Sequence, residues 1–321
     1  MKKSVKIVLF SLLGIILVLF VIAMYVNISG IPSYENQAEE LVVEVTPERV
    51  AEGARIAAVM CASCHGSTDG KLGGSFMADA SDFGEVHAPN ITQHPQFGIT
   101  QYTDGELVYL LRTGIRRDGQ YVPPWMPKFP LLSDEDIYSI VAFLHSDHPQ
   151  VQPSDLESVP VNANFLAKML SRTVFKPLPY PESPIEAPDR SDKVAYGRYL
   201  SVAKFDCYSC HSASFKAIDM MVPENTEGFF GGGNKLYDRD LKEIYSPNLT
   251  MSKETGLGDW SEGDFIRTLR YGMRPDNTPL RYPMAPAPMI TDEEASAIWV
   301  YLQTVPVIEN KVPRVEQTTL R

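Results

Sequence analysis

The sequence predicts an all-α protein in which one N-terminal transmembrane helix precedes two tandem copies of one helical domain. Three observations predict this architecture. An uncharged run of 20 residues lies near the N-terminus, a five-residue motif occurs twice, and the residues downstream of that motif recur at a constant offset of 158 positions. The 25 prolines and 15 tyrosines indicate long ordered loops between helices rather than a sheet-rich fold.

The N-terminal run, Ile7–Val26, has the length that a membrane requires. At 1.5 Å per residue its 20 residues extend about 30 Å, the thickness of the hydrocarbon core. By the positive-inside rule Lys2, Lys3 and Lys6 stay in the cytoplasm, so the rest of the chain is exported. The alternative is a cleaved signal peptide. However, the run exceeds the usual length of roughly 7–15 apolar residues and no clear cleavage site follows it, which favours an uncleaved anchor.

All four cysteines lie in two Cys-x-x-Cys-His motifs, Cys61–His65 and Cys207–His211. This motif attaches a c-type haem: the two thiols bond to the porphyrin vinyl groups, and the histidine becomes the proximal iron ligand. A redox-active cysteine pair and a zinc site are the alternatives. Paired zinc knuckles lie about 15–20 residues apart, whereas Cys207 lies 146 positions beyond Cys61. We therefore predict two covalently bound haem c groups, attached through Cys61, Cys64, Cys207 and Cys210, with His65 and His211 as iron ligands.

Downstream of the motifs the two copies align without a gap, which indicates an internal duplication. The identical pairs include Pro89/Pro247, Asn90/Asn248, Thr92/Thr250, Arg112/Arg270, Gly114/Gly272, Arg116/Arg274 and Met126/Met284. A chain of 321 residues is long enough for an anchor and two domains of roughly 100–150 residues each. The predicted boundaries are 1–26 for the anchor, 27–46 for a polar tether, 47–148 for the first domain, 149–190 for a proline-rich linker, 191–305 for the second domain and 306–321 for a tail.

Each copy carries three helical signals. A helix leads into each haem motif, from Pro47 in the first copy and from Lys193 in the second. Capping boxes at Thr103–Glu106 and Ser261–Asp264 start a second helix in each copy. The last helices begin at Ser133 and Thr291, carry one apolar face and are expected to cross the helix that enters the haem motif. A further short helix is predicted in the linker, within residues 162–174.

The second axial ligand of each iron is predicted to be a methionine. Met126 and Met284 occupy equivalent positions in a loop. Met273 and Met289 of the second copy correspond instead to Ile115 and Leu131 of the first. A thioether favours ferrous iron and raises the reduction potential. The alternative distal ligands are His87 and His94, whose offset partners are Tyr245 and Ser252, so at most the first haem would have two histidine ligands.

Together these features resemble the class I cytochrome c family, in the two-haem form found as electron-transfer subunits of membrane dehydrogenases and oxidases. The resemblance covers about residues 47–147 and 190–305, and is carried by the haem motifs, the repeated Pro-Asn-x-Thr, the loop methionine and the closing helix. It implies that the carbonyls of Pro89 and Pro247 accept a hydrogen bond from Nδ1 of His65 and His211, which fixes each imidazole.

Two departures from the family pattern are visible. Pro127 follows the first methionine, but Ala285 follows the second. The second copy has 36 residues from His211 to Pro247 where the first has 24 from His65 to Pro89. The additional segment is expected around Val222–Asp240, where it would cover a haem edge or contact a partner. Four repeated arginines are candidates for pairing with haem propionates, the alternative being exposed helix ends: Arg112, Arg116, Arg270 and Arg274.

The sequence predicts an electron-transfer protein rather than an enzyme. It would relay single electrons from a membrane donor, a dehydrogenase or a quinol-oxidising complex, to a terminal oxidase or a soluble acceptor. We expect it on the periplasmic side of a bacterial cytoplasmic membrane, with redox proteins as partners and no small-molecule substrate. The net charge is −11, and −14 without the three N-terminal lysines, which argues against nucleic acid and anionic lipid headgroups as partners.

Two other functions stay open at this point. A di-haem peroxidase also carries two such motifs, but it needs a displaceable distal ligand and acid–base groups, for which Glu85, His87 and His94 are the candidates. The chain would alternatively serve as a non-catalytic subunit within a larger respiratory complex. This last role is compatible with an electron relay.

Overall fold

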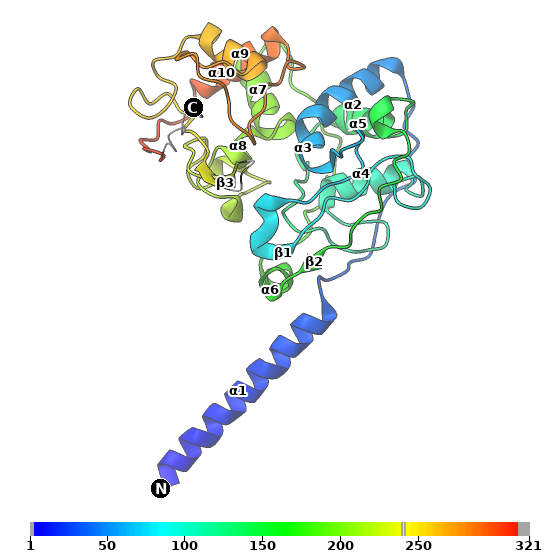
Figure 1. Ribbon diagram of the computed structural model, residues 1–321, viewed down its shortest axis with the longest axis vertical. Coiled ribbons are helices and arrows are strands. Elements are labelled where there is room, and N and C mark those ends of the chain that lie inside the picture. The colour runs from blue at the N-terminus through cyan, green and yellow to red at the C-terminus, as the bar shows by residue number, and fades with distance from the viewer. Residues whose placement is uncertain (1–2, 239, 241, 314–321) are drawn as a thin grey trace.

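The computed structural model describes residues 3–238, 240 and 242–313 of the chain. Lys2 of the N-terminal lysines, residue 239 of the expected additional segment and residues 314–321 of the predicted tail lie outside this description. Helix α1, Lys3–Ser29, projects from the rest of the molecule (Figure 1). Among the described residues it is the one helix that is long and apolar enough to cross a membrane.

The remaining helices fall into two lobes with the same order of elements (Figure 1). The N-terminal lobe contains α2 (Pro47–Met60), α3 (Ala62–His65), α4 (Asp104–Thr113) and α5 (Asp134–Leu144). The C-terminal lobe contains α7 (Lys193–Arg198), which continues as the π-helical turn η3 (Tyr199–Lys204), then α8 (Cys207–Cys210), α9 (Glu262–Tyr271) and α10 (Asp292–Leu302). Helix α6 (Phe165–Thr173) lies between the lobes in sequence, and the short 3₁₀ turns are η1 (Ala78–Phe83), η2 (Pro149–Val151), η4 (Phe215–Ala217) and η5 (Pro223–Asn225).

The fold is mostly helical rather than purely all-α, because two small antiparallel sheets are present. Strand β1 (Gly84–Glu85) pairs with β2 (Asn162–Ala163), and β3 (Lys235–Tyr237) pairs with β4 (Glu243–Tyr245). Strands of two or three residues are too short to show an alternating pattern, so the sequence gives no signal for them. The β1–β2 pair joins the N-terminal lobe to the segment that leads into α6.

The predicted helix starts are confirmed. Thr103 and Ser261 form capping boxes at α4 and α9, and Thr291 forms a third at α10. Helices α4 and α9 both end at a glycine in the left-handed conformation, Gly114 with φ of 82° and Gly272 with φ of 75°. That conformation favours glycine because it has no Cβ.

The helix entering each haem motif crosses the last helix of the same lobe, as predicted. Gly53 of α2 lies against α5 so closely that a Cβ there would meet the carbonyl oxygen of Ser139 at 1.9 Å. Gly197 of α7 lies in the same way against Ala297 of α10, again at 1.9 Å. These two glycines therefore permit the close crossing around which each lobe's apolar core is built.

The segment predicted as a free tether, residues 27–46, instead lies along the N-terminal lobe. The backbone N–H of Tyr34 donates to the carbonyl of Gly119 at 2.8 Å. The backbone N–H of Val43 donates to a carboxylate oxygen of Asp104 at 2.7 Å. The chain between α1 and α2 is thus fixed to the lobe at both ends.

The proline-rich linker, residues 149–190, also wraps around the N-terminal lobe and contains α6 within the predicted range. The backbone N–H of Leu178 donates to the carbonyl of Thr113 at 3.1 Å, and that of Asp134 donates to the carbonyl of Ile185 at 2.9 Å. The linker therefore does not separate the lobes as a flexible connection.

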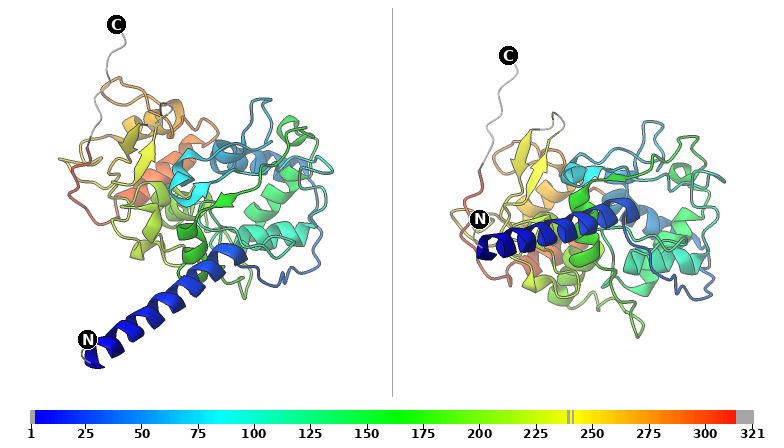
Figure 2. Two further views of the ribbon diagram at one scale, coloured as in Figure 1. Left: turned by 60° about the horizontal axis from the view of Figure 1, so that its bottom comes forward. Right: turned by 90° about the horizontal axis from the view of Figure 1, so that it is seen from below.

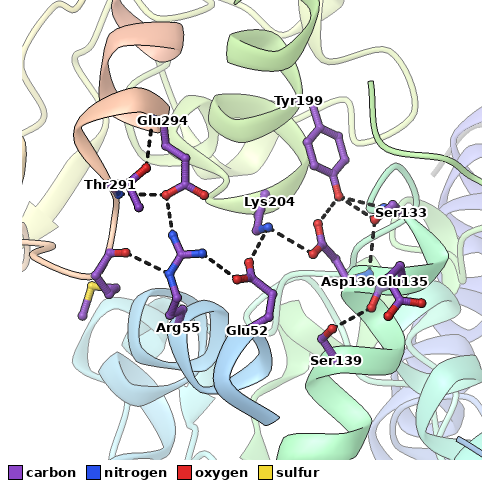
Figure 3. Close-up of polar contacts among 11 residues, drawn as sticks. Glu52, Arg55, Ser133, Glu135, Asp136, Ser139, Tyr199, Lys204, Thr291 and Glu294 are labelled. Carbon is purple, nitrogen blue, oxygen red and sulfur yellow. Dashed lines mark hydrogen bonds and ion pairs between the residues drawn. The ribbon is translucent and has the colours of Figure 1, made fainter. Parts of the chain in front are cut away.

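A buried network of charged side chains joins the two lobes (Figure 3). Lys204, at the end of η3, reaches across to Glu52 of α2 at 2.6 Å and to Asp136 of α5 at 3.0 Å. The Lys204 side chain is only 5% exposed. Burial alone would lower the pKa of Lys204, but the carboxylates of Asp136 and Glu52 outweigh it and raise that pKa above its ordinary value.

The network extends to both sides of Lys204. Arg55 of α2 forms ion pairs with Glu52 at 2.5 Å and with Glu294 of α10, and donates to the carbonyl of Met289 at 2.9 Å. Tyr199 donates to Asp136 and contacts Ser133 Oγ at 2.8 Å. We call this set the interlobe network: Glu52, Arg55, Ser133, Asp136, Tyr199, Lys204 and Glu294.

A second contact joins the lobes near the haem motifs. The backbone N–H of Tyr237 in β3 donates to a carboxylate oxygen of Asp79 in η1 at 3.0 Å. The charge of Asp79 adds to the raised pKa of Cys64 in one motif and of Cys210 in the other; burial is the larger cause for both thiols. The interlobe network and this contact together fix the relative orientation of the two motifs.

Candidate functional site: two paired haem-attachment sites

Each Cys-x-x-Cys-His motif forms a single helical turn at the end of the helix that leads into it. In the N-terminal lobe α2 ends beside Cys61, and α3 carries the motif through His65. In the C-terminal lobe α8 holds Cys207 and Cys210, and His211 follows as its C-cap. A helical turn places the two thiols and the imidazole close together, which is the arrangement that covalent haem attachment requires.

Both histidines are buried, and each ring is oriented by a backbone carbonyl. Nδ1 of His65 lies 2.8 Å from the carbonyl oxygen of Pro89, and Nδ1 of His211 lies 3.0 Å from that of Pro247. Because a carbonyl only accepts, Nδ1 carries the proton in both rings and Nε2 keeps its lone pair. This is the tautomer that a haem iron needs.

The electrostatic surroundings keep both imidazoles neutral. Burial lowers the pKa of His65 and His211, and the hydrogen bonds to Pro89 and Pro247 act in the opposite direction with a smaller effect. A neutral ring is the form that binds a metal ion. Both sites therefore fit the proximal side of a haem.

The cysteines do not have the environment of a reactive thiol pair. All four are free in the structure. Burial raises the pKa of Cys61 and of Cys207 to about 12, whereas redox-active cysteines have a lowered pKa because the thiolate is the reactive form. This disfavours the redox-pair interpretation of the motifs.

The repeated Pro-Asn-x-Thr sequence shapes the loop that presents each proline carbonyl. Oδ1 of Asn90 accepts from the backbone N–H of Thr92 at 2.9 Å and from its hydroxyl at 2.6 Å. Asn248 and Thr250 repeat this pair of bonds at 2.8 and 2.7 Å. All four side chains are buried, so the turn is a fixed part of each site.

Two glycines that the sequence analysis did not identify complete the proximal side. The backbone N–H of Gly74 donates to the carbonyl of His65 at 2.8 Å, and that of Gly232 donates to the carbonyl of His211 at the same distance. Both have positive φ, 93° for Gly74 and 68° for Gly232. A Cβ on Gly74 would collide with the carbonyl of Ala88, and a Cβ on Gly232 would collide with the backbone of Pro247. These two glycines also obey the 158-residue offset, which marks them as equivalent positions but does not show what they contact.

That equivalence corrects the expected position of the additional segment. Because Gly74 and Gly232 match, the additional residues lie between His211 and Gly232 rather than around Val222–Asp240. They do not form a loose flap: Phe230 is fully buried. Its ring contacts Phe229 at 4.6 Å and Tyr301 of α10 at 6.2 Å between centroids.

The two predicted methionine ligands lie in loops that differ in burial and in hydrogen bonding. Met126 is half-buried and packs against the core. The buried Lys128 side chain holds its loop, since Nζ donates to the carbonyls of Pro123 and Met126, each at 2.8 Å. In the second copy Pro286 occupies the position of Lys128, and the Met284 side chain is 39% exposed. The roles of Met126 and Met284 as iron ligands stay predictions.

The candidate propionate-binding arginines have partners within the protein. Arg112 is 1% exposed, pairs with Asp134 at 2.6 Å and donates to the carbonyls of Phe129 and Leu132. Arg270 pairs with the equivalent Asp292. These arginines therefore fasten the end of the methionine loop to the start of the last helix in each lobe. Arg116 pairs with its neighbour Asp118 at 3.1 Å.

The residues considered for a peroxidase do not form one acid–base group. Nε2 of His87 lies 3.2 Å from Glu85. His94 instead stacks on Phe97, with ring centroids 4.6 Å apart, and Nε2 lies 3.5 Å from Asp155. Its Nδ1 accepts two backbone N–H bonds within its own loop.

Two thiols, a neutral imidazole held by a proline carbonyl and a helical turn that unites them are the features of a c-type haem-attachment site. Comparison with known proteins agrees. Residues 48–144 match the family described as Cytochrome C oxidase, cbb3-type, subunit III, whose cytochrome c domain implies covalently bound haem c.

The chain is also similar to cytochrome subunits over most of its length. It is 31% identical over 260 residues to the cytochrome c subunit of the quinone alcohol dehydrogenase of Gluconobacter oxydans, covering 77% of this chain and 52% of the relative. It is 28% identical over 260 residues to the fructose dehydrogenase cytochrome subunit of Gluconobacter japonicus, covering 77% and 50%. The chain thus spans about half the length of these dehydrogenase subunits.

A relative of similar size is a diheme cytochrome c-type protein of Cereibacter sphaeroides, 28% identical over 263 residues, which cover 78% of this chain and 83% of that protein. The match indicates a cytochrome c domain at residues 48–144, and electron transfer is the function that these comparisons support.

Proposed function

We propose that the protein is a membrane-anchored di-haem cytochrome c in which two class I cytochrome c domains relay single electrons. The donor would be a membrane-bound dehydrogenase or a quinol-oxidising complex, and the acceptor a terminal oxidase or a soluble protein. In this proposal the chain is the electron-transfer subunit of such a system and has no substrate of its own.

The observation that carries this proposal is the duplication of one complete proximal site. Each lobe has two thiols on a helical turn, and a neutral imidazole whose Nδ1 is bonded to a proline carbonyl at 2.8 or 3.0 Å. A hydrogen bond of this kind orients the ligand and increases its basicity. A bound haem would supply the one-electron couple of its iron at each site.

The chain's own residues would hold each iron in a saturated coordination shell. Cys61, Cys64 and His65 would bind the first haem, with Met126 as the sixth ligand; their equivalents in the second lobe are Cys207, Cys210, His211 and Met284. Lys128 would keep the first methionine in place through the carbonyls of its loop. Saturated coordination favours electron transfer over peroxide binding.

Contacts between α1 and the linker support an anchor that stays attached. Nζ of Lys168 donates to the carbonyl of Asn27 at 3.1 Å, and Arg172 donates to Ser29 Oγ at 2.7 Å. Cleavage of α1 as a signal peptide would remove partners that α6 uses. With the positive-inside rule, this geometry supports a single-pass protein whose lobes lie on the periplasmic side.

The test is a redox titration of the purified protein with haem counted by its pyridine haemochrome. We expect two haems per chain, and in Met126→Ala and Met284→Ala a lower potential and a new high-spin signal from one haem each. Met273→Ala serves as the control and should change neither potential. One haem per chain, or no change in either variant, would contradict the proposal. Rapid peroxide turnover by the wild-type protein would favour the peroxidase instead.

A further inference from the structure

Helix α6 packs beside the N-terminal lobe, and it lies at the end of α1 (Figures 1 and 2). Lys168 bonds to the carbonyl and the side chain of Asn27, and Arg172 bonds to Ser29 and to the carbonyl of Gly30. These contacts join α6 to the last turn of α1, just beyond the apolar run. The height of α6 is therefore set by the point where the anchor leaves the hydrocarbon core.

An aromatic contact supports the same height. The Arg172 guanidinium lies 5.2 Å from the ring centroid of Tyr25 near the end of α1. Tyrosine is enriched at the boundary between lipid and water, where its ring is apolar and its hydroxyl is hydrated. The pair of Tyr25 and Arg172 thus lies at the level of the lipid headgroups.

Exposed apolar side chains lie at both ends of α6. Phe165 is 44% exposed and Leu166 is 42% exposed at its start, and Val174, directly after the helix, is 63% exposed. The face with the buried Ala167 and Ser171 packs on the N-terminal lobe. Exposed apolar side chains on a short helix at this height are the arrangement of a helix that lies in a membrane interface.

The charge around α6 is opposite to that of the whole protein. Lys168, Arg172 and Lys176 lie in a stretch from residue 158 to 181 that contains no Asp or Glu, although the chain carries a net charge of −11. The partners that the described residues give to Lys168 and Arg172 are uncharged groups, so the two positive charges are not neutralised there. Anionic lipid headgroups attract such a basic segment.

We propose that α6 is a second membrane contact: its exposed apolar side chains insert into the headgroup region of a bilayer with anionic lipid, and its basic residues bind the lipid phosphates. This inference rests on the proposed membrane anchor. It also revises the expectation that the acidic chain avoids anionic lipids, since the charge is unevenly distributed.

The contact would bring the first haem site close to the membrane surface. Phe175, two residues after α6, contacts Phe83 at 6.0 Å, and Phe83 contacts Trp125 at 6.0 Å between ring centroids. Trp125 directly precedes the predicted ligand Met126. A line of three aromatic rings therefore joins the end of α6 to the first methionine loop, so the first site faces a donor in the bilayer.

The test uses the full-length, haem-loaded protein in nanodiscs made of equal parts phosphatidylglycerol and phosphatidylcholine. A photo-crosslinking benzoylphenylalanine replaces Phe165 in one sample and Tyr271 in the control. Tyr271 is 61% exposed and ends α9, at the far side of the molecule from α1 (Figure 1). Mass spectrometry after illumination is expected to find lipid adducts at position 165 and none at position 271.

A second readout is the orientation of the haem planes, measured by EPR on oriented membranes. The wild-type protein should give orientation-dependent signals, and a variant with Phe165→Glu, Leu166→Glu and Val174→Glu should show a weaker dependence; an unchanged dependence would overturn the inference. These side chains are exposed, so haem content and potentials are expected to stay unchanged.

Absence of lipid adducts at position 165 would overturn the inference, as would equal adduct formation at both positions. Crosslinking of position 165 to a protein in native membranes, in place of lipid, would also overturn it. Haem content, potentials and membrane association are measured on the same samples. Loss of haem, of the expected potentials or of membrane association in the wild-type protein would contradict the proposed function. If all three are as expected but no lipid adducts form at position 165, only the role of α6 is contradicted.

Discussion

Replacing Lys204 by methionine tests how strongly the interlobe network holds the two lobes together. Among the residues that the structure describes, Lys204 is the cation that pairs with both Asp136 and Glu52, and its side chain is 5% exposed. Methionine keeps most of the volume and removes the charge. The substitution therefore leaves two carboxylates with less compensation and creates little cavity.

The expected cost follows from the burial of each carboxylate. Removal of one partner from a buried ion pair costs about 3–5 kcal/mol, because the other charge stays buried. Asp136 is 11% exposed, but Glu52 is 25% exposed and keeps Arg55 as a partner. The lower end of the range applies, about 3 kcal/mol, which corresponds to about a hundredfold change in the equilibrium between docked and separated lobes.

The assay is urea unfolding of the full-length protein in detergent, followed by haem absorbance, with small-angle X-ray scattering to detect separation of the lobes. Lys204→Met should lower the first midpoint by about 1 M or more. The triple variant Lys204→Met, Glu52→Gln, Asp136→Asn should recover most of the loss, because no buried charge is left unpaired. Lys235→Met, which removes the exposed pair with Glu243, is the control and should leave the midpoint unchanged.

An unchanged midpoint in Lys204→Met would refute this reasoning. A triple variant no more stable than the single one would refute it as well, since the loss would then come from packing rather than from unpaired charge.

Three further predictions concern single positions. Lys128→Met leaves two carbonyls of the Met126 loop without their donor; we expect a loss of about 1–3 kcal/mol in urea unfolding and a lower potential for the first haem only, measured by redox titration. Gly74→Ala places a Cβ 2.3 Å from the carbonyl oxygen of Ala88 at a φ of 93°, so it should cost more than about 1–2 kcal/mol and reduce haem incorporation, measured by the haemochrome spectrum. The third prediction concerns Glu52. Burial acts to raise the pKa of Glu52, but Lys204 and Arg55 outweigh burial, so this pKa is lowered. The contribution of Glu52 to lobe docking is therefore present above the ordinary glutamate pKa and is lost as the pH falls through the lowered value. Scattering from about pH 7 down to pH 3 should therefore record separation of the lobes only in the acidic range.

Each of these has a control or a contradicting result. Gly70→Ala is the matched control for Gly74→Ala. The φ of Gly70 is also positive, 78°, but no atom lies within 4 Å of the added Cβ, so this variant should incorporate haem normally. For Lys128→Met, an equal fall in both potentials would mean that the effect is not local. For the acid titration, separation that begins near neutral pH would assign the docking to a different group.

The sequence predicts those parts of the site that the duplication repeats. The motifs and the capping boxes at Thr103 and Ser261 recur at fixed offsets, and each follows a local rule of spacing or helix capping. The role of the proline carbonyls, in contrast, is implied by the family resemblance. Gly74 and Gly232 are also repeated, but a single glycine has no local signature; only the structure reveals that a Cβ would strike the neighbouring backbone.

Features that differ between the two copies escape prediction. Lys128 corresponds to Pro286, so comparison of the copies gives no reason to select it. The interlobe network joins residues more than 60 positions apart, such as Asp136 and Lys204, and such contacts depend on how the lobes pack. For Arg112 the sequence offered a haem propionate or an exposed helix end, and neither describes its buried position. Its burial depends on Asp134 and on two loop carbonyls that lie beside it only in the folded chain.

The path of residues 27–46 along the N-terminal lobe has a consequence for the proposed membrane-anchored form of the protein. With Tyr34 and Val43 bonded to that lobe, the segment after α1 offers no slack by which the haem sites could swing from one partner to another. In that proposal the haem sites keep a constant elevation above the bilayer. A donor and an acceptor would therefore have to present their own redox centres at that elevation, and a soluble acceptor would have to descend to it.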